Sequence, residues 1–337
     1  MASDYAKAMI RMETWLNENP TDPTVHEARA MLVLTYHNDE TRKNQFQREV
    51  DRIRQNGRPG VIAVLKLMEN PTTASRLGNA IRDVLVSIGE PSIKPLMEVM
   101  KGNNWRLRQS AQRTLIQLGP LAVPALIEAL DDPDVYTRSM SIDALSKIGD
   151  KRAIEPLKEK LNDPNKMLQI EAAAALDKMG ESVPTNIIVD GMDDPNLEVR
   201  RAATKATWEI VDKPPINVVL KAMKDEDAQV RNYAVLSASK TGSAEVIKPL
   251  VKVLKTDQDD QVKNSSAKAL EKFGSPAVND LIAILNNKSD IELTIRVVQV
   301  LGNIGDRRAI KPMEKVYEEA NNPLLKNETA KALNKID

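Results

Sequence analysis

The stretch Leu118–Gly149, LGPLAVPALIEALDDPDVYTRSMSIDALSKIG, contains the unit from which most of the chain is built. It begins with Leu-Gly and ends with Ile-Gly, and the segment Asp131–Asp134 joins its two apolar-periodic halves. Apolar residues spaced three and four positions apart predict two amphipathic helices. The acidic, proline-containing linker between them is typical of a turn. The unit is therefore a predicted helix pair.

This unit recurs along the chain with a nearly constant period. A short, constant period of predicted helix pairs indicates a stacked solenoid. Glycine suits the closing position because a helix commonly ends on a residue in the left-handed region. Val211 breaks the rule and is followed by Asp212-Lys213-Pro214-Pro215, so we expect a different turn there. The closing residues lie 30 to 32 residues apart, at Gly57, Gly89, Gly119, Gly149, Gly180, Val211, Gly242, Gly274, Gly305 and Asp337.

Within each unit, the first helix is predicted to begin near a proline, because the first turn of a helix needs no donor at that position. The second helix carries Ala and Leu in a fixed order, as in Ala172-Ala173 and Ala175-Leu176. The small residues allow close approach of helices and the large ones fill the layer, so these stripes are predicted core. The aligned prolines are Pro95, Pro124, Pro156, Pro184, Pro249 and Pro312.

Residues 1–57 do not follow the repeat. Three helices are predicted there, over Ala6–Leu16, Thr24–Tyr36 and Glu40–Arg54. A stacked array needs an atypical unit to cover its end, so the segment is interpreted as an N-terminal helical cap, with a separate recognition module as the alternative. The repeat array itself is predicted over residues 58–337, with units closing near 89, 119, 149, 180, 211, 242, 274, 305 and 337.

Composition narrows the function classes. Lys plus Arg and Asp plus Glu both number 48, so the overall charge favours neither nucleic acid nor a membrane as ligand. Residues 1–117 nevertheless carry 17 basic and 13 acidic side chains. The chain has no Cys, which excludes disulfides and thiolate sites. No apolar run is long enough to span a bilayer, and the first residues lack a signal-peptide core, so a cytoplasmic protein without a membrane partner is predicted.

An Asp in the inter-helix turn is followed six residues later by a basic residue that opens the second helix. An Asp near a helix N-terminus can accept backbone N–H bonds and interacts favourably with the helix dipole, and the basic residue can bridge to it. We call this series the ladder and interpret it as structural. Its pairs are Asp132/Arg138, Asp194/Arg200, Asp225/Arg231 and Asp257/Lys263.

The combined pattern of Ile-Gly, Ala-Ile-x-Pro-Leu, Asp-x-Asp and Val-Arg resembles HEAT repeats, most closely the short HEAT-like repeats of the phycobilisome-lyase type. The clearest matches are residues 150–157, DKRAIEPL, and 306–312, DRRAIKP. The resemblance implies an all-α protein, a right-handed α-solenoid (superhelix) of about nine two-helix repeats with the atypical cap. It also implies that the ladder ties each inter-helix turn to the next repeat.

Two branches of such proteins have chemistry. Those resembling deoxyhypusine hydroxylases carry several His-Glu pairs that bind iron, whereas this chain has only His26 and His37. The bilin lyases act on a tetrapyrrole and a partner's Cys, without a sharply defined motif that can be matched here. The sequence therefore predicts no enzymatic activity, no catalytic residue, no metal ligands and no cofactor.

In HEAT arrays the second helices usually line the concave face, so their outward positions are the candidate binding residues. Apolar side chains rimmed by charge are typical of a protein interface. We predict a non-enzymatic scaffold, assembly factor or regulatory subunit that binds another protein there; the alternatives are a nucleic-acid-binding protein and a tetrapyrrole lyase or lyase subunit. The predicted partner-binding residues are Arg113, Met140, Ile170, Arg201, Lys205, Tyr233, Leu236, Lys268, Ile295 and Arg296.

Two tryptophans give opposite expectations. Thr207 occupies a layer position that Leu fills in other units, so Trp208 is expected to turn inward and compensate. Trp105 lies in an inter-helix turn beside Arg106 and Arg108, and it is the better candidate for an exposed aromatic.

Overall fold

The computed structural model describes residues 11, 14–15, 18, 29–31, 33–34, 37, 43–55, 57–69, 71–286 and 290–336, with the side chains of 71–76 left aside. Every regular element in these residues is an α-helix or a 3-10 helix, so the predicted all-α fold is confirmed. The helix predicted over Glu40–Arg54 is α3, Lys43–Gln55. The helices predicted over Ala6–Leu16 and Thr24–Tyr36 fall largely outside the described residues.

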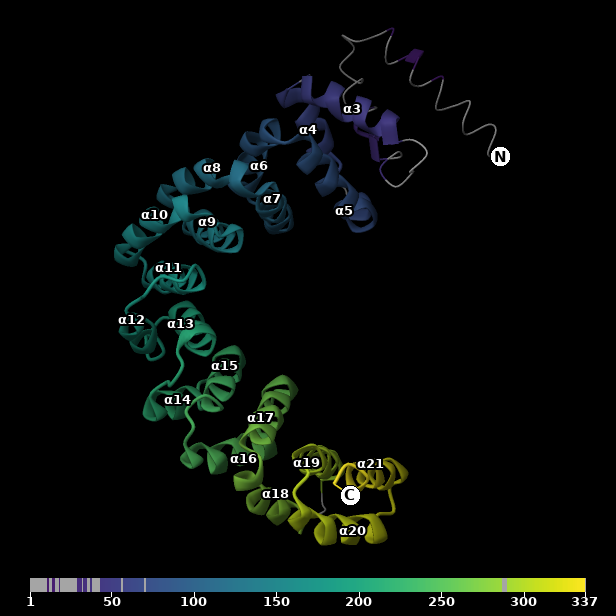
Figure 1. The fold of residues 1–337 in the computed structure, drawn as a ribbon, viewed down its shortest axis with the longest axis vertical. Helices are drawn as coiled ribbons and strands as arrows, with labels where there is room; N and C mark the ends of the chain where they lie inside the picture. Colours follow the sequence, from purple (N-terminus) through teal and green to yellow (C-terminus); the bar gives the residue numbers. More distant parts are fainter. Residues whose placement is uncertain are drawn as a thin grey trace. The chain divides into compact units, whose positions relative to one another are not determined.

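Residues up to Lys160 form one compact unit. Its helices fall into two layers, with α5 packed on α7 and α7 packed on α9 in the second-helix layer (Figure 1). The first helices are α4 (Arg58–Lys66), α6 (Ile93–Met100), α8 (Val123–Glu128) and α10 (Ile154–Glu159). The second helices are α5 (Pro71–Ile88), α7 (Trp105–Leu118) and α9 (Val135–Ile148).

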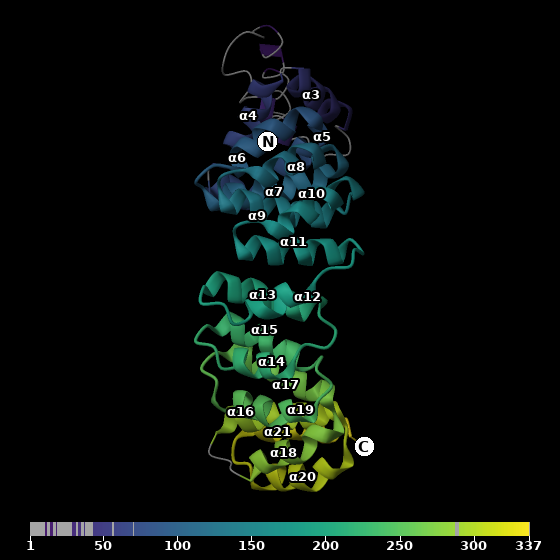
Figure 2. The same cartoon turned by 90° about the vertical axis from the view of Figure 1, so that its left-hand side faces the viewer.

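Residues Leu161–Asp337 form the other compact unit. Each of its second helices packs on the next, and Figure 2 shows these helices one below another. The second helices lie on the inner side of the curve that this unit follows in Figure 1. They are α11 (Lys166–Lys178), α13 (Leu197–Ile210), α15 (Ala228–Ala238), α17 (Asp260–Phe273), α19 (Ile291–Ile304) and α21 (Pro323–Leu333). The first helices are α12 (Thr185–Gly191), α14 (Ile216–Ala222), α16 (Ile247–Thr256), α18 (Val278–Leu285) and α20 (Ile310–Glu319).

The turns between repeats have the conformations that their closing residues predict. All eight predicted closing glycines have positive φ, between 60° and 85°. Val211 instead ends α13 in an extended conformation, and Pro215 caps α14, which confirms the different turn expected there. Several first helices follow a short 3-10 turn. These 3-10 helices are Glu90–Ser92, Gly119–Leu121, Lys151–Ala153, Ala244–Val246, Ser275–Ala277 and Arg307–Ala309, and two others, Ala129–Asp131 and Lys160–Asn162, follow α8 and α10.

The apolar stripes predicted as core are buried. Ala172, Ala173, Ala175 and Leu176 of α11 are each at most 3% exposed. Small residues also set how closely the helices approach. A Cβ added to Gly302 of α19 would lie 2.6 Å from the Ala332 Cβ of α21. The absence of a side chain at Gly302 therefore permits the contact between these two helices.

The basic residues of the ladder connect neighbouring repeats, because two of them bond to the Asp of the next repeat rather than to the Asp of their own. Arg231 Nη1 donates to the main-chain carbonyl of Asp225 at 2.9 Å, and its Nε and Nη2 donate to the two carboxylate oxygens of Asp257 at 2.8 and 2.9 Å. Arg200 repeats the arrangement, contacting the Asp194 carbonyl at 3.0 Å and the Asp225 carboxylate at 2.8 Å. The predicted bridge within the pair is therefore wrong for Arg200 and Arg231, whose guanidinium groups reach the carboxylate of the next repeat. This link to the next repeat is the one that the resemblance to HEAT repeats implies.

The remaining ladder positions refine this pattern. Arg138 donates to the Asp132 carbonyl at 2.8 Å, whereas the Asp132 carboxylate pairs with Lys101 of the preceding turn at 2.7 Å. Lys263 pairs with the exposed Asp260 at 3.3 Å instead of Asp257. Each ladder Asp also accepts a backbone N–H two residues on, as Asp257 does from Asp259 at 2.9 Å. Asp259 is the residue that caps α17.

Candidate protein-binding face of the second helices

The second helices of the unit 161–337 expose one stripe of side chains, and this stripe is the candidate site. In α13, α17, α19 and α21, an exposed position lies five residues after the residue that occupies the basic position of the ladder (Arg200, Lys263, Thr294 and Lys326). These exposed residues are Lys205, Lys268, Gln299 and Lys331. Residues at this position project away from the layer because the buried residues of the same helices take the opposite side. The stripe contains two distinct features, an aromatic patch on α13 and α15 and a polar groove between α17, α19 and α21.

The aromatic patch consists of Lys205, Trp208, Tyr233 and Leu236. The rings of Trp208 and Tyr233 lie 6.1 Å apart between centroids with an interplanar angle of 39°. Trp208 is 37% exposed, and Tyr233 and Leu236 are half-buried one helical turn apart on α15. The Lys205 ammonium is 3.9 Å from Glu209, on the same helix. The patch thus presents apolar ring surface beside a cation.

The expectation that Trp208 turns inward is wrong. Thr207 is fully buried, and its hydroxyl lies 3.1 Å from the Met192 sulfur, so the layer position is already filled. Trp208 follows directly on the helix and is rotated to the exposed side, where it meets Tyr233. Trp105 is 62% exposed, as predicted, with the Arg106 guanidinium 5.3 Å from its ring centroid.

Ile170 does not belong to the exposed face, although it was predicted there. It is 1% exposed, and a Cβ added to Gly191 of α12 would lie only 2.7 Å from its Cδ1. The absence of a side chain at Gly191 leaves the space that Ile170 fills. Ile295 likewise packs partly against the core. Both side chains therefore contribute to packing between helices.

Other predicted residues are spread over different surroundings. Arg201 is held by Asp227, the N-cap of α15, at 2.6 Å, so its guanidinium ties α13 to the next second helix. Arg113 is exposed on α7, and Met140 is half-buried on α9, where its carbonyl accepts from Gln112 at 2.9 Å. These last two lie in the unit that ends at Lys160 and are described apart from the stripe.

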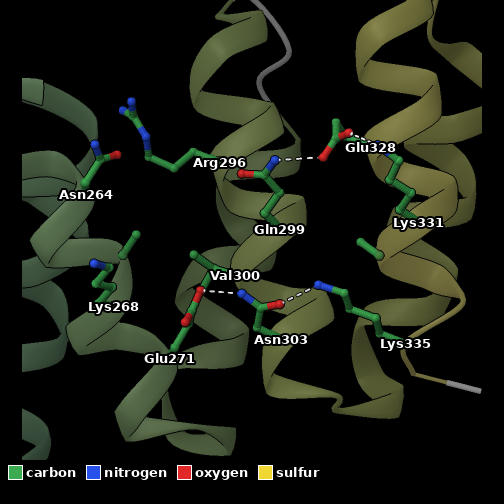
Figure 3. A pocket seen from close by; sticks show the side chains of 12 residues that line it. Asn264, Lys268, Glu271, Arg296, Gln299, Val300, Asn303, Glu328, Lys331 and Lys335 are labelled. Atoms are coloured by element: carbon green, nitrogen blue, oxygen red, sulfur yellow. Dashed lines mark hydrogen bonds and ion pairs between the residues drawn. The ribbon is translucent and has the colours of Figure 1, made fainter. Parts of the chain in front are cut away.

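The groove between α17, α19 and α21 has a volume of about 420 Å³. Two predicted residues, Lys268 and Arg296, line it, together with residues of the same stripe further along each helix (Figure 3). Buried Ala267, Val300 and Ala332 form its apolar part. The polar lining residues are Asn264, Lys268, Glu271, Arg296, Gln299, Asn303, Glu328, Lys331 and Lys335.

Hydrogen bonds across the groove connect its three helices. Asn303 of α19 donates to Glu271 of α17 at 2.7 Å and accepts from Lys335, just after α21, at 2.8 Å. Gln299 donates to Glu328 at 2.8 Å. Glu328 accepts hydrogen bonds from Lys331 and from Gln299. These bonds lower the pKa of the Glu328 carboxyl, and the bond from Lys331 has the larger effect. Glu328 is therefore ionised and already satisfied at neutral pH.

Sequence reasoning missed Asn303, Lys335 and Glu271 as members of the groove. They lie eight or nine residues after the ladder position, one helical turn beyond the exposed position at five residues. Extending the predicted stripe by one turn is the signal that finds them.

Two further observations concern the same described residues. No helix among them is long and apolar enough to cross a membrane. Within them, no group of three or more His, Asp or Glu side chains is placed to hold a metal ion.

Stacked helix pairs with this period, closing glycines and ladder define an α-solenoid. The chain belongs to the HEAT-repeat family: the model of HEAT repeats matches residues 93–177, 123–207 and 185–271, together more than half of the sequence. The predicted resemblance to HEAT repeats is thereby confirmed.

Among curated proteins, the chain is similar to the beta subunit of phycocyanobilin lyase from Nostoc sp., with 33% identity over 85 residues. The match covers 25% of this chain and 42% of the lyase subunit, so the chain spans less than half the length of this relative. The likeness to repeats of the phycobilisome-lyase type is thus borne out by a partial match.

Two solved structures share the fold. The Escherichia coli protein YibA is 18% identical with a TM-score of 0.56, covering 77% of this chain and 96% of that protein. Yeast importin-β (Kap95p) is 11% identical with a TM-score of 0.55, covering 100% of this chain and 51% of that structure. At these identities the likeness concerns the solenoid fold alone.

The prediction that the chain has no enzymatic activity is contradicted by the match to the lyase subunit, which points toward lyase chemistry. The prediction rested on the absence of a recognisable catalytic motif. Lyases of this type have no sharply defined motif, so a motif search could not exclude them.

Proposed function

We propose that the chain binds a partner protein through the exposed stripe of its second helices, with the aromatic patch of Lys205, Trp208, Tyr233 and Leu236 at the centre of the contact. The observation that carries this proposal is the contact between exposed Trp208 and half-buried Tyr233, whose ring centroids lie 6.1 Å apart. Aromatic side chains are enriched in protein interfaces, and a charged residue such as Lys205 suits the polar rim of one. The cysteine-free sequence supports a cytoplasmic setting for this contact.

The size of the rings sets the expected contribution of the patch. Tyrosine and tryptophan side chains each bury a large area in a contact, and they are enriched among the residues that dominate binding energy. A residue of this kind typically costs about 2 kcal/mol or more when truncated to alanine. That loss corresponds to a roughly thirtyfold larger dissociation constant.

The test is affinity capture of the partner by the full chain and its variants. Trp208→Ala with Tyr233→Ala is expected to abolish capture at partner concentrations that saturate the unchanged chain. Tyr317→Ala is the matched control, because Tyr317 is equally exposed (38% against 37% for Trp208) but lies on the first helix α20. Equal capture by the double variant and the control would refute the proposed surface.

A second proposed function is that of a lyase subunit acting on a tetrapyrrole. The partial match to the beta subunit of phycocyanobilin lyase favours this function. The exposed Trp208 ring, with Tyr233 beside it, offers an apolar face on which a conjugated ring system can stack. Partner binding and lyase action are compatible, because a subunit works within an assembly.

Adding phycocyanobilin to the full chain tests this second function. We expect the visible absorption of the pigment to shift and intensify on binding, with roughly fivefold weaker binding after Trp208→Ala, since one stacking contact is worth about 1 kcal/mol. Tyr317→Ala again serves as the control. A spectrum identical to that of the free pigment at excess protein would count against the lyase function.

A further inference from the structure

The groove between α17, α19 and α21 lies on the same stripe as the aromatic patch but has different chemistry. Four cations, Lys268, Arg296, Lys331 and Lys335, line it, against the two carboxylates Glu271 and Glu328. Arg296 is balanced at the rim by Glu292 at 3.1 Å and Asp260 at 3.8 Å. Lys331 is balanced by Glu328 at 2.6 Å.

Two of these cations, Lys268 and Lys335, form no ion pair with a carboxylate among the described residues. Together with the hydrogen bond from Lys331, the charge of Lys335 helps to lower the pKa of Glu328. Lys268 is exposed on α17, and no described hydrogen-bonding or charged group lies within bonding distance of its ammonium. Lys335 bonds only to the neutral side chain of Asn303. Figure 3 shows the two lysines on opposite walls of the groove, Lys268 on α17 and Lys335 after α21. The groove therefore has on each side one positive charge that is not held in an ion pair, Lys268 on one wall and Lys335 on the other.

Amide side chains lie between these charges. Asn264 is exposed on α17 and has no bonding partner among the described residues. Gln299 uses its N–H group on Glu328, and its carbonyl oxygen remains available as an acceptor. A carboxamide both donates to and accepts from a peptide group, so these two side chains match the main chain of an extended peptide.

We propose that this groove binds an extended acidic segment of a partner protein, with Lys268 and Lys335 pairing carboxylates and Asn264 and Gln299 bonding its main chain. The inference rests on the proposed function, because it names the chemistry of a partner that docks on the second-helix stripe. Burial of the segment over Ala267, Val300 and Ala332 excludes water from the charged contacts and strengthens them.

A nucleic acid fits this groove less well. Glu271 and Glu328 would face the continuous negative charge of a phosphate backbone, and no aromatic side chain lines the groove for base stacking. An acidic peptide carries separated carboxylates and main-chain amides instead, so it can avoid the two glutamates and use the carboxamides.

The test uses a short fluorescent Glu-rich peptide and fluorescence anisotropy with the full chain. We expect binding that weakens with salt, and a loss of about tenfold or more in affinity for Lys268→Glu with Lys335→Glu, since reversing two contacts converts attraction to repulsion. Lys248→Glu with Lys255→Glu is the control of equal net charge. Both control lysines are exposed on the first helix α16, and the control variant is expected to bind like the unchanged chain.

Three outcomes would overturn the proposal: no binding of the Glu-rich peptide at low salt, equal binding of the same peptide with Gln in place of Glu, or tighter binding of a single-stranded RNA of the same length. Circular dichroism of each variant separates lost binding from lost folding. Because the probe is a defined peptide, this test is independent of partner capture. The groove can fail it while Trp208 and Tyr233 still govern capture, and the groove can pass it while substitution of Trp208 and Tyr233 leaves capture unchanged.

Discussion

Replacing Arg231 by alanine is expected to lower the free energy of unfolding by about 3 kcal/mol. The Asp257 carboxylate is only 7% exposed and receives two bonds from this guanidinium, and those bonds raise the pKa of Arg231. The variant leaves that carboxylate buried without its cation, and the Asp225 carbonyl loses a donor at 2.9 Å. A urea titration followed by circular dichroism measures the change.

Lys263→Ala is the matched control, because Lys263 holds the ladder position of the following unit. Its ammonium contacts Asp260, which is 69% exposed, at 3.3 Å. An exposed pair of this kind contributes less than about 1 kcal/mol, so the control should unfold close to the unchanged chain. Equal destabilisation by the two substitutions would contradict a specific contribution of the Arg231–Asp257 ion pair to the free energy of unfolding.

Gly302→Ala is expected to destabilise the chain by about 1–3 kcal/mol, despite the higher helix propensity of alanine. The new Cβ would lie 2.6 Å from the Ala332 Cβ, 2.8 Å from the Ala332 Cα and 3.0 Å from the Ala332 carbonyl oxygen. Since two of these atoms belong to the backbone of α21, relief requires the helices to separate. Hydrogen exchange should therefore become faster in α21.

Gly78→Ala provides the same substitution without the contact. Gly78 lies inside α5, and a Cβ there meets no atom within 4 Å. Alanine in an open helix position should stabilise by up to about 1 kcal/mol. The two variants are thus expected to shift the unfolding midpoint in opposite directions. A stabilising shift for both would contradict the close approach of α19 and α21.

The repeat could be predicted from the sequence because its signals are local. Closing glycines such as Gly149 and Gly305 need only the conformation of their own residue, and the prolines need only the position of a helix start. Val211 is predicted to be an exception on the same local grounds. It adopts an extended conformation at the end of α13, because a residue with a Cβ avoids the left-handed region.

The site could be predicted only in part, because exposure depends on the residue that faces each side chain. Ile170 is buried because Gly191 of the next helix leaves a space for it. Trp208 is exposed because buried Thr207 already fills its layer. The spacing of the ladder residues predicts a bridge within each pair, and only the resemblance to HEAT repeats implies a link to the next repeat, because the reach of an arginine depends on how the helices stack.

The groove shows the same limit. Lys268 and Arg296 were predicted as binding residues from helical periodicity, and both line it. Asn303 and Lys335 lie one helical turn beyond the predicted stripe, so spacing can place them on this face, whereas the bond between them depends on how α19 and α21 pack.

A cross-linking map of the full chain with its copurifying partner, made with a lysine-reactive reagent and read by mass spectrometry, tests the central claim most directly. The account predicts cross-links from Lys205 and Lys268, which are exposed on the second helices α13 and α17. Lys248 and Lys255, exposed on the first helix α16, should not cross-link to the partner. A map with partner cross-links at Lys248 and Lys255 and none at Lys205 and Lys268 would contradict binding by the second-helix face.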